Sequence, residues 1–165
     1  MTYRLMRPGD EGFTFDLVKR GFDEFVRRDC SREGIEEFLS ASHTMVFGRP
    51  SGHFVMVAES DGQIVGMIDV KNDSHICLLF VDSSCHGQGI GRELVEQATA
   101  ICRSRQPDLK MIDVNSSLWA VPVYISLGFC QVEPQQERMG IRFVRMVKQI
   151  ESGTDRTGGV ADKRG

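Results

Sequence analysis

Three glycines at alternate positions, Gly87, Gly89 and Gly91, mark the part of this sequence best suited to chemistry. They lie in "VDSSCHGQGIGREL" (81–94), directly after the apolar run "HICLLFV" (75–81) and directly before an apolar pattern of helical spacing. Glycine at such a junction is destabilising unless the turn needs a positive φ or a ligand lies against the backbone. Because the first N–H groups of a helix have no intrahelical partners, the stretch predicts a phosphate site.

Two common phosphate motifs do not fit this stretch. A P-loop requires GxxxxGK[ST], but Arg92 and Glu93 follow the last glycine. The dinucleotide fingerprint GxGxxG requires a third glycine where Arg92 stands, and the candidate ribose-binding acid, Asp113, lies within a strand rather than at its end. The strands before the glycines also suit an antiparallel meander, which disfavours that fold.

Length and composition favour one domain over residues 1–150 of a 165-residue chain. A net charge of −3 disfavours a nucleic-acid partner. The five cysteines are odd in number and include no CxxC pair, so the sequence predicts reduced thiols and neither a metal site nor a disulfide framework. The opening residues do not resemble a signal peptide, and no apolar run approaches a membrane span, which favours a cytoplasmic protein without a membrane partner. Residues 151–165 are expected to be a disordered tail.

The first half of the chain predicts a strand, two helices and a three-stranded antiparallel meander. The strand covers about 2–8, one helix covers about 11–28, and a second begins near Ser31 and leads into a loop over 42–52. Strand-like runs at 53–60, 63–71 and 75–81 follow, joined by the turn signals Asp61-Gly62 and Asn72-Asp73.

The second half predicts a crossover. A helix from Ile90 ends at Pro107 and leads to a buried strand over 110–116, so this strand should lie parallel to the run 75–81. A short helix over about 119–127 should be capped by Gly128, and strands near 129–133 and 141–150 should form a hairpin. The fold class is therefore α/β, with a mixed, mostly antiparallel seven-stranded sheet and helices on both faces.

These features together resemble the GNAT superfamily of acyl-CoA-dependent N-acetyltransferases. "HGQGIG" (86–91) closely resembles the family signature [Q/R]xxGx[G/A], and "LLFVDSS" resembles the end of the family's fourth strand. "VNSSLWAVPVYISLGF" (114–129) resembles its second motif, in which an asparagine ends the fifth strand and A…Y…GF follows on a short helix. The order of elements also agrees up to about Ile150. The resemblance implies that the fourth and fifth strands form a splayed parallel pair.

The resemblance also implies a coenzyme A site. Phe80 and Val81 match strand residues whose backbone pairs with the pantetheine arm, while their side chains are expected in the core. His86 stands where glutamine or arginine is usual in the family, so it could bind the cofactor or simply be exposed. Asn115 matches an asparagine that often contacts the cofactor, but it could equally cap the end of the strand. The backbone N–H groups expected to cradle the pyrophosphate are those of Gly87, Gln88, Gly89, Ile90, Gly91 and Arg92.

Tyr124 matches a tyrosine that lies near the thioester sulfur in many members of the family. A phenol can protonate the departing thiolate as a general acid, although an aromatic core role is the alternative. The strand 75–81 carries no carboxylate to act as base, and His75 and Asp69 are the nearest candidates, so the base stays unassigned. Cys85 beside His86 does not make a convincing nucleophile pair, because such groups usually meet through space, and direct transfer is favoured.

The resulting hypothesis is acetyl transfer from acetyl-CoA to a primary amine, by direct attack in a ternary complex and without a metal. The alternative is a non-catalytic acyl-CoA-binding or sensor protein, which the absence of a carboxylate on the fourth strand favours. The first two helices and the loop 42–52 should wall the acceptor site, and their acidic residues either attract a cation or form a solvated face. The acceptor is open between small-molecule and protein amines, and family habit suggests a homodimer. The acidic residues are Asp23, Glu24, Glu36 and Glu37.

Overall fold

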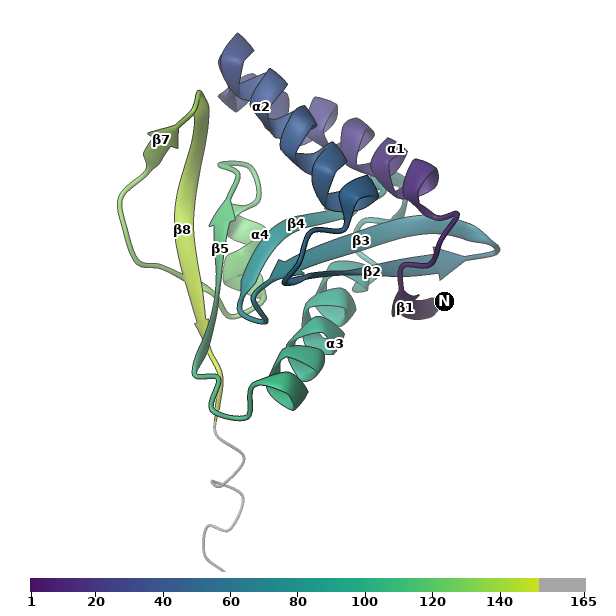
Figure 1. Ribbon diagram of the computed structural model, residues 1–165. Coiled ribbons are helices and arrows are strands. Elements are labelled where there is room, and N and C mark those ends of the chain that lie inside the picture. Colours follow the sequence, from purple (N-terminus) through teal and green to yellow (C-terminus); the bar gives the residue numbers. More distant parts are fainter. Residues whose placement is uncertain (152–165) are drawn as a thin grey trace, which may run out of the picture.

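The computed structural model describes residues 1–151, which form one eight-stranded sheet with helices on both faces (Figure 1). The predicted tail, beyond residue 151, lies outside the described residues. The strands are β1 (Thr2–Leu5), β2 (His53–Ser60), β3 (Gln63–Lys71), β4 (His75–Val81), β5 (Met111–Ser116), β6 (Cys130–Gln131), β7 (Gln136–Arg138) and β8 (Ile141–Gln149). The α-helices are α1 (Glu11–Gly21), α2 (Arg32–His43), α3 (Ile90–Arg105) and α4 (Val121–Ser126).

The strand order is β1-β2-β3-β4-β5-β8-β6, with β7 paired to β8. All pairs are antiparallel except β4 and β5, as the sequence predicted. Both predicted turns of the meander are confirmed, because φ is positive at Asp61, Gly62, Asn72 and Asp73. A positive φ at both central residues is the mark of a type I′ hairpin turn.

Two details differ from the sequence prediction. The loop expected over 42–52 begins as helix, because α2 continues as a π-helical turn over Thr44–Gly48. The sheet has eight strands rather than seven, because β7 forms a hairpin with β8 around Met139 and Gly140, whose φ values are 53° and 78°. The stretch "QQERMG" has no apolar alternation, so backbone pairing alone makes this strand, and pattern reading does not detect it.

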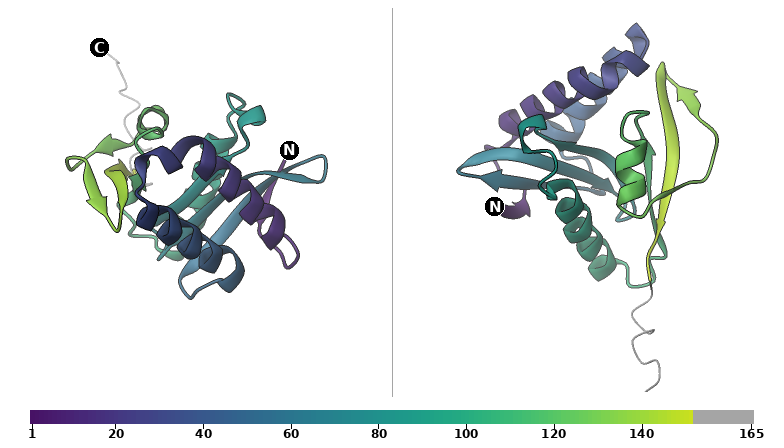
Figure 2. Two further views of the ribbon diagram at one scale, coloured as in Figure 1. Left: turned by 90° about the horizontal axis from the view of Figure 1, so that it is seen from above. Right: turned by 180° about the vertical axis from the view of Figure 1, so that it is seen from behind.

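Helices α1 and α2 cover one face of the sheet, while α3 and α4 cover the other (Figures 1 and 2). Each face buries its own apolar cluster. Leu17, Val18 and Met67 belong to the cluster under α1, and Ile68, Leu94 and Met146 belong to the cluster under α3. In the described part of the chain, no helix has the length and apolarity needed to cross a membrane.

The parallel pairing between β4 and β5 is short. Only His75–Asp113 and Ile76–Val114 are paired. On the other side of β4, Asp69 faces Leu78 and Val70 faces Ile76, so Cys77 is an extra residue in a β-bulge. A bulge bends the strand that carries it, and here it directs the rest of β4 away from β5. The predicted splayed parallel pair is confirmed, and it leaves one edge of β4 without a strand partner beyond Ile76.

Helix α3 lies very close to the sheet at Gly66 of β3. A Cβ atom on Gly66 would lie 3.0 Å from Ile90 Cγ2 and 3.1 Å from Leu94 Cδ1. Because both side chains are buried, they have little room to move aside. This approach places the first turn of α3 beside the end of β4.

We expect Gly66→Val to lower the free energy of unfolding by about 1–3 kcal/mol, because the added methyl groups would overpack this contact. Urea unfolding would measure the loss. Gly12→Ala is the matched control, since a Cβ atom there meets nothing within 4 Å on the exposed side of α1. It should leave stability unchanged or raise it slightly. Equal stability of the Gly66→Val variant and the parent protein would contradict the close approach of α3.

Candidate active site

Two adjacent cavities lie at the gap between β4 and β5. The outer cavity, of about 320 Å³, extends from the glycine turn 87–91 to α4. The inner cavity, of about 120 Å³, lies between β4, β5, β8 and the π-helical turn Phe22–Val26 that follows α1. Six residues line both cavities, and we call this shared lining the junction of the cavities: Leu79, Val81, His86, Trp119, Ala120 and Tyr124.

The glycine turn forms the end of the outer cavity. Gly87 and Gly89 both have a φ of 78°, which side-chain-bearing residues rarely adopt. The first backbone hydrogen bond of α3 runs from Glu93 N to Gly89 O at 3.0 Å, so the preceding N–H groups have no helical acceptor. Most of the predicted phosphate-binding residues line this cavity, and only Gln88 does not. Those that line it are Gly87, Gly89, Ile90, Gly91 and Arg92.

The side chains around the turn stiffen it. Arg92 Nη2 donates to Ser126 O at 3.0 Å and so ties the start of α3 to the end of α4 across the outer cavity. Asp82 accepts hydrogen bonds from Ser84 Oγ (2.6 Å) and Ser84 N (3.0 Å), and its pKa is lowered mainly by these bonds. The turn therefore presents its backbone in a defined shape.

His86 belongs to the lining that the two cavities share. Its Nε2 atom lies 2.9 Å from Val81 O and must donate, because a carbonyl oxygen only accepts. Its ring stacks on Phe25, with centroids 5.4 Å apart, and Phe25 stacks on Trp119 at 4.1 Å. His86 thus bonds to the strand predicted to meet the pantetheine arm, although the sequence left its role open.

Tyr124 lies at the junction itself. The residue is 5% exposed, and burial raises the pKa of its phenol well above the usual range. Its ring packs edge to face on Phe129, with centroids 5.3 Å apart. Tyr124 therefore contributes a protonated phenol side chain to the lining that the two cavities share.

Of the other predicted residues, Phe80, Val81 and Asn115 line the inner cavity. Phe80 also packs against Phe38 and lies so close to Gly21 of α1 that a Cβ atom there would clash with its ring. Its side chain is therefore mainly structural, as predicted, while its backbone lies at the free edge of β4.

Neither base candidate from the sequence lines a cavity. Asp69 is completely buried and bonds to His53 Nδ1 at 2.8 Å, and burial raises the pKa of its carboxyl. His75 Nδ1 lies 3.1 Å from Asp113 Oδ1, outside both cavities. His53, Asp69 and Cys77 also place possible ligand atoms within 4.8 Å of one another, but the His53–Asp69 distance is that of an ordinary hydrogen bond.

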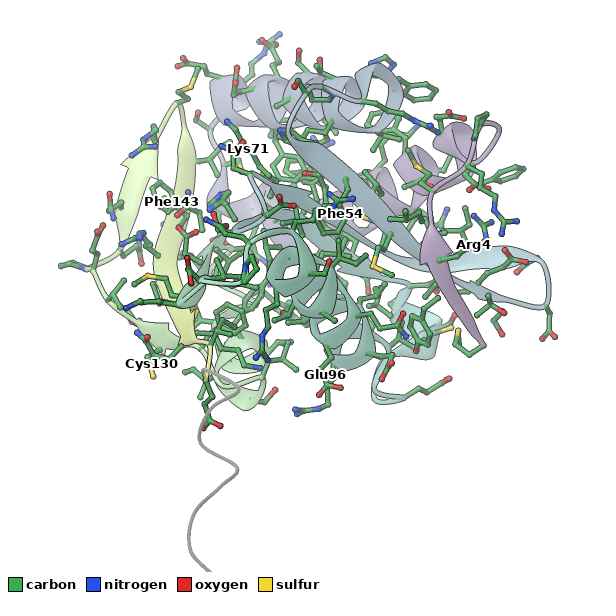
Figure 3. The ribbon with its side chains drawn as sticks, turned by 60° about the horizontal axis from the view of Figure 1, so that its bottom comes forward. Arg4, Phe54, Lys71, Glu96, Cys130 and Phe143 are labelled. Atoms are coloured by element: carbon green, nitrogen blue, oxygen red, sulfur yellow. The ribbon has the colours of Figure 1, made fainter. Side chains whose placement is uncertain are left out.

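The structure adds residues that sequence reasoning did not assign to the site. Phe25, Trp119, Arg142 and Phe143 line the inner cavity, with Phe143 projecting from β8 (Figure 3). Trp119 lies inside the second motif and Phe25 lies in the helix predicted over about 11–28, so both carried a weak signal. Arg142 carried none, because β8 approaches β4 only in the folded chain.

Comparison with known proteins agrees with this geometry. The family model of the acetyltransferase (GNAT) domain matches residues 26–150. The chain belongs to this family. The uncharacterized protein YxbD of Bacillus subtilis (strain 168) is 34% identical over 71 residues, which are 42% of this chain and 45% of that protein.

Solved structures share the fold of this GNAT domain. A GCN5-related N-acetyltransferase from Rhodopseudomonas palustris superposes with a TM-score of 0.76 at 21% identity, over 90% of this chain and 95% of that one. The PaiA N-acetyltransferase from Thermoplasma acidophilum, solved in complex with coenzyme A, has a TM-score of 0.69 at 14% identity, over 91% of this chain and 100% of that one.

We expect Cys77 to resist alkylation. Burial and the nearby Asp69 raise the pKa of its thiol to about 12. At pH 8 only about one thiol in ten thousand would then be the reactive thiolate. Iodoacetamide should therefore modify the exposed Cys130 at least ~100-fold faster, as peptide mass spectrometry would show. Equal rates at Cys77 and Cys130 would contradict this description of the bulge.

Proposed function

We propose that this GNAT domain transfers an acetyl group from acetyl-CoA to a primary amine by direct attack in a ternary complex. The observation that carries the proposal is the meeting of the two cavities at Tyr124. The outer cavity ends on free backbone N–H groups suited to a phosphate, and Tyr124 belongs to the lining of both the outer and the inner cavity. The coenzyme A complex of the Thermoplasma acidophilum relative supports assigning the cofactor to the outer cavity.

The main chain supplies most of the cofactor site. Gly87, Gly89 and Gly91 let a pyrophosphate approach the N–H groups at the start of α3, where the helix dipole also favours negative charge. The edge of β4 that β5 leaves free can pair with an extended pantetheine arm as a further strand would. Because His86 already bonds to Val81 O, we expect it to adjust when the arm binds.

Tyr124 is proposed as the general acid. When the amine nitrogen bonds to the acetyl carbon, the carbon–sulfur bond breaks and the thiolate must gain a proton. The phenol supplies that proton and regains one from the attacking nitrogen, so the reaction leaves an amide and a free thiol. Since burial raises its pKa, Tyr124 stays protonated throughout the usual assay range.

An acyl-CoA-binding sensor is the second candidate. It is favoured by one observation: among the described residues, no carboxylate lines either cavity and could take the proton of an ammonium. Release of free thiol from acetyl-CoA separates the two functions. Release that increases with an added amine supports the transferase. Protein that binds acetyl-CoA but releases no thiol with small amines or peptides supports the sensor.

We expect Tyr124→Phe to lower kcat by about 10²–10⁴-fold while leaving the Kd for acetyl-CoA within a factor of about two, because only the proton donor is removed. Thiol release would give kcat, and isothermal titration would give Kd. Tyr3→Phe is the matched control, since Tyr3 is the other tyrosine of the chain, lies on β1 and lines neither cavity. Full turnover by Tyr124→Phe would rule out the general-acid role.

Gly91→Ala should separate cofactor binding from folding. A Cβ atom at Gly91 would lie 3.8 Å from Val81 Cγ2, so the protein itself accepts it, and alanine is the better helix former. A bound pyrophosphate, however, would be displaced from one or more N–H groups. We expect the melting temperature to stay equal or rise while the Kd for acetyl-CoA increases roughly 10- to 100-fold. Unchanged affinity would place the pyrophosphate elsewhere.

A further inference from the structure

The inner cavity is aromatic and carries one charged group. Aromatic rings surround it. They come from the π-helical turn Phe22–Val26, from α2, β4 and β8, and from α4 and the segment before it. Within residues 1–151, no aspartate or glutamate lines it, and the only charged residue of its lining is Arg142, whose side chain is 44% exposed. The rings are those of Phe25, Phe38, Phe80, Trp119, Tyr124 and Phe143.

This lining is unfavourable for a polycation. Moving an ammonium group out of water is costly unless a carboxylate pairs with it, and no carboxylate is in place. The acidic residues that the sequence offered for this purpose lie outside both cavities. Asp23 instead pairs with Arg27 at 2.7 Å, and Glu36 faces Arg32 on the exposed side of α2. Polyamines and aminoglycosides therefore do not suit this site.

Arg142 has hydrogen-bonding capacity to spare. Its Nη2 atom lies 3.6 Å from Asp29 Oδ1, and its Nε atom donates weakly to Asp29 O at 3.4 Å. A guanidinium has five N–H donors in a planar fork that matches a carboxylate, so donors remain for a ligand. Arg145, three residues along β8, differs because it already faces Asp113 and Glu133 and lines neither cavity.

We infer that the acceptor is an amino acid, or a closely related amino carboxylate, with an apolar side chain. Its carboxylate would bind Arg142, its side chain would pack among the rings, and its amine would face the junction at Tyr124. The cavity volume of about 120 Å³ suits a small apolar group; an engineered apolar cavity of about 150 Å³ in another protein holds benzene. The inference rests on the proposed function and names the substrate class of the same site.

The same lining accounts for the absence of a carboxylate base. Burial in an apolar cavity disfavours the charged form of an amine. The amine therefore releases a proton to water as it enters and attacks as the free base. No aspartate or glutamate is needed for that step.

The first test compares acceptors that differ only in the carboxylate. Thiol release from acetyl-CoA is measured with phenylalanine against phenethylamine, and with leucine against isopentylamine. Spermidine and kanamycin serve as polycations. We expect kcat/KM to be roughly 10- to 100-fold higher for each amino acid than for its decarboxylated partner, and the polycations to be poorer still.

The second test asks whether the preference for the carboxylate depends on the side chain of Arg142. Arg142→Gln should remove the preference for the carboxylate, and Arg142→Lys should restore part of it, because lysine keeps the charge but loses the fork. Arg145→Gln is the matched control and should keep the preference. Thermal unfolding and the Kd for acetyl-CoA of each variant check that the fold and the cofactor site are intact.

The outcomes separate the inference from the proposed function. Acetylation of spermidine, kanamycin or phenethylamine at least as fast as of phenylalanine overturns the inference and leaves the transferase in place. A carboxylate preference that survives in Arg142→Gln also overturns it. If no amine stimulates thiol release, isothermal titration of phenylalanine and leucine into the acetyl-CoA-bound protein decides. Binding that depends on Arg142 supports the amino carboxylate site and moves the function to the sensor; no binding overturns both the site and its ligand class.

Discussion

The early end of pairing between β4 and β5 is the constraint on which the rest of this structure depends. Only two residue pairs join the strands before the bulge at Cys77 turns β4 away. A sheet that remained paired would satisfy its own hydrogen bonds and leave no room between the strands. Because it separates, β4 keeps a free edge, and β8 can approach from the far side of β5. Both cavities lie in the space created in this way.

The two cavities use different parts of the polypeptide. The outer one is built largely from main chain: the glycine turn, the first turn of α3 and the edge of β4. The close approach at Gly66 holds α3 against the sheet, and the bond from Arg92 to Ser126 holds its first turn against α4. Such a surface suits a ligand whose phosphates and amides are the same in every reaction of the family.

The inner cavity is built largely from side chains. Aromatic rings form much of its lining, and Arg142 supplies the one charged residue. The carboxylate nearest to the bulge, Asp69, is turned into the sheet and bonded to His53 rather than offered to a substrate. In a site with this balance, we propose that the phenol of Tyr124 moves a proton and that recognition of the acceptor depends on shape and on the guanidinium of Arg142.

The sequence by itself determined the features that depend on local backbone geometry. Glycines at alternate positions after an apolar run specify a tight turn, whichever way the chain packs, and Asp61-Gly62 specifies a hairpin because both residues tolerate a positive φ. The order of elements followed from such signals, whereas Tyr124 was proposed for the site only because residues 114–129 resemble the second motif of the family. Only the tertiary structure decided which side chains line the gap between β4 and β5. The bulge at Cys77 leaves no local pattern, β7 has no apolar alternation, and Arg142 of β8 lines the same cavity as Phe25 of the π-helical turn although the two lie far apart in the sequence. Long-range packing brings these residues together. Local sequence patterns do not indicate which distant side chains will line the same cavity.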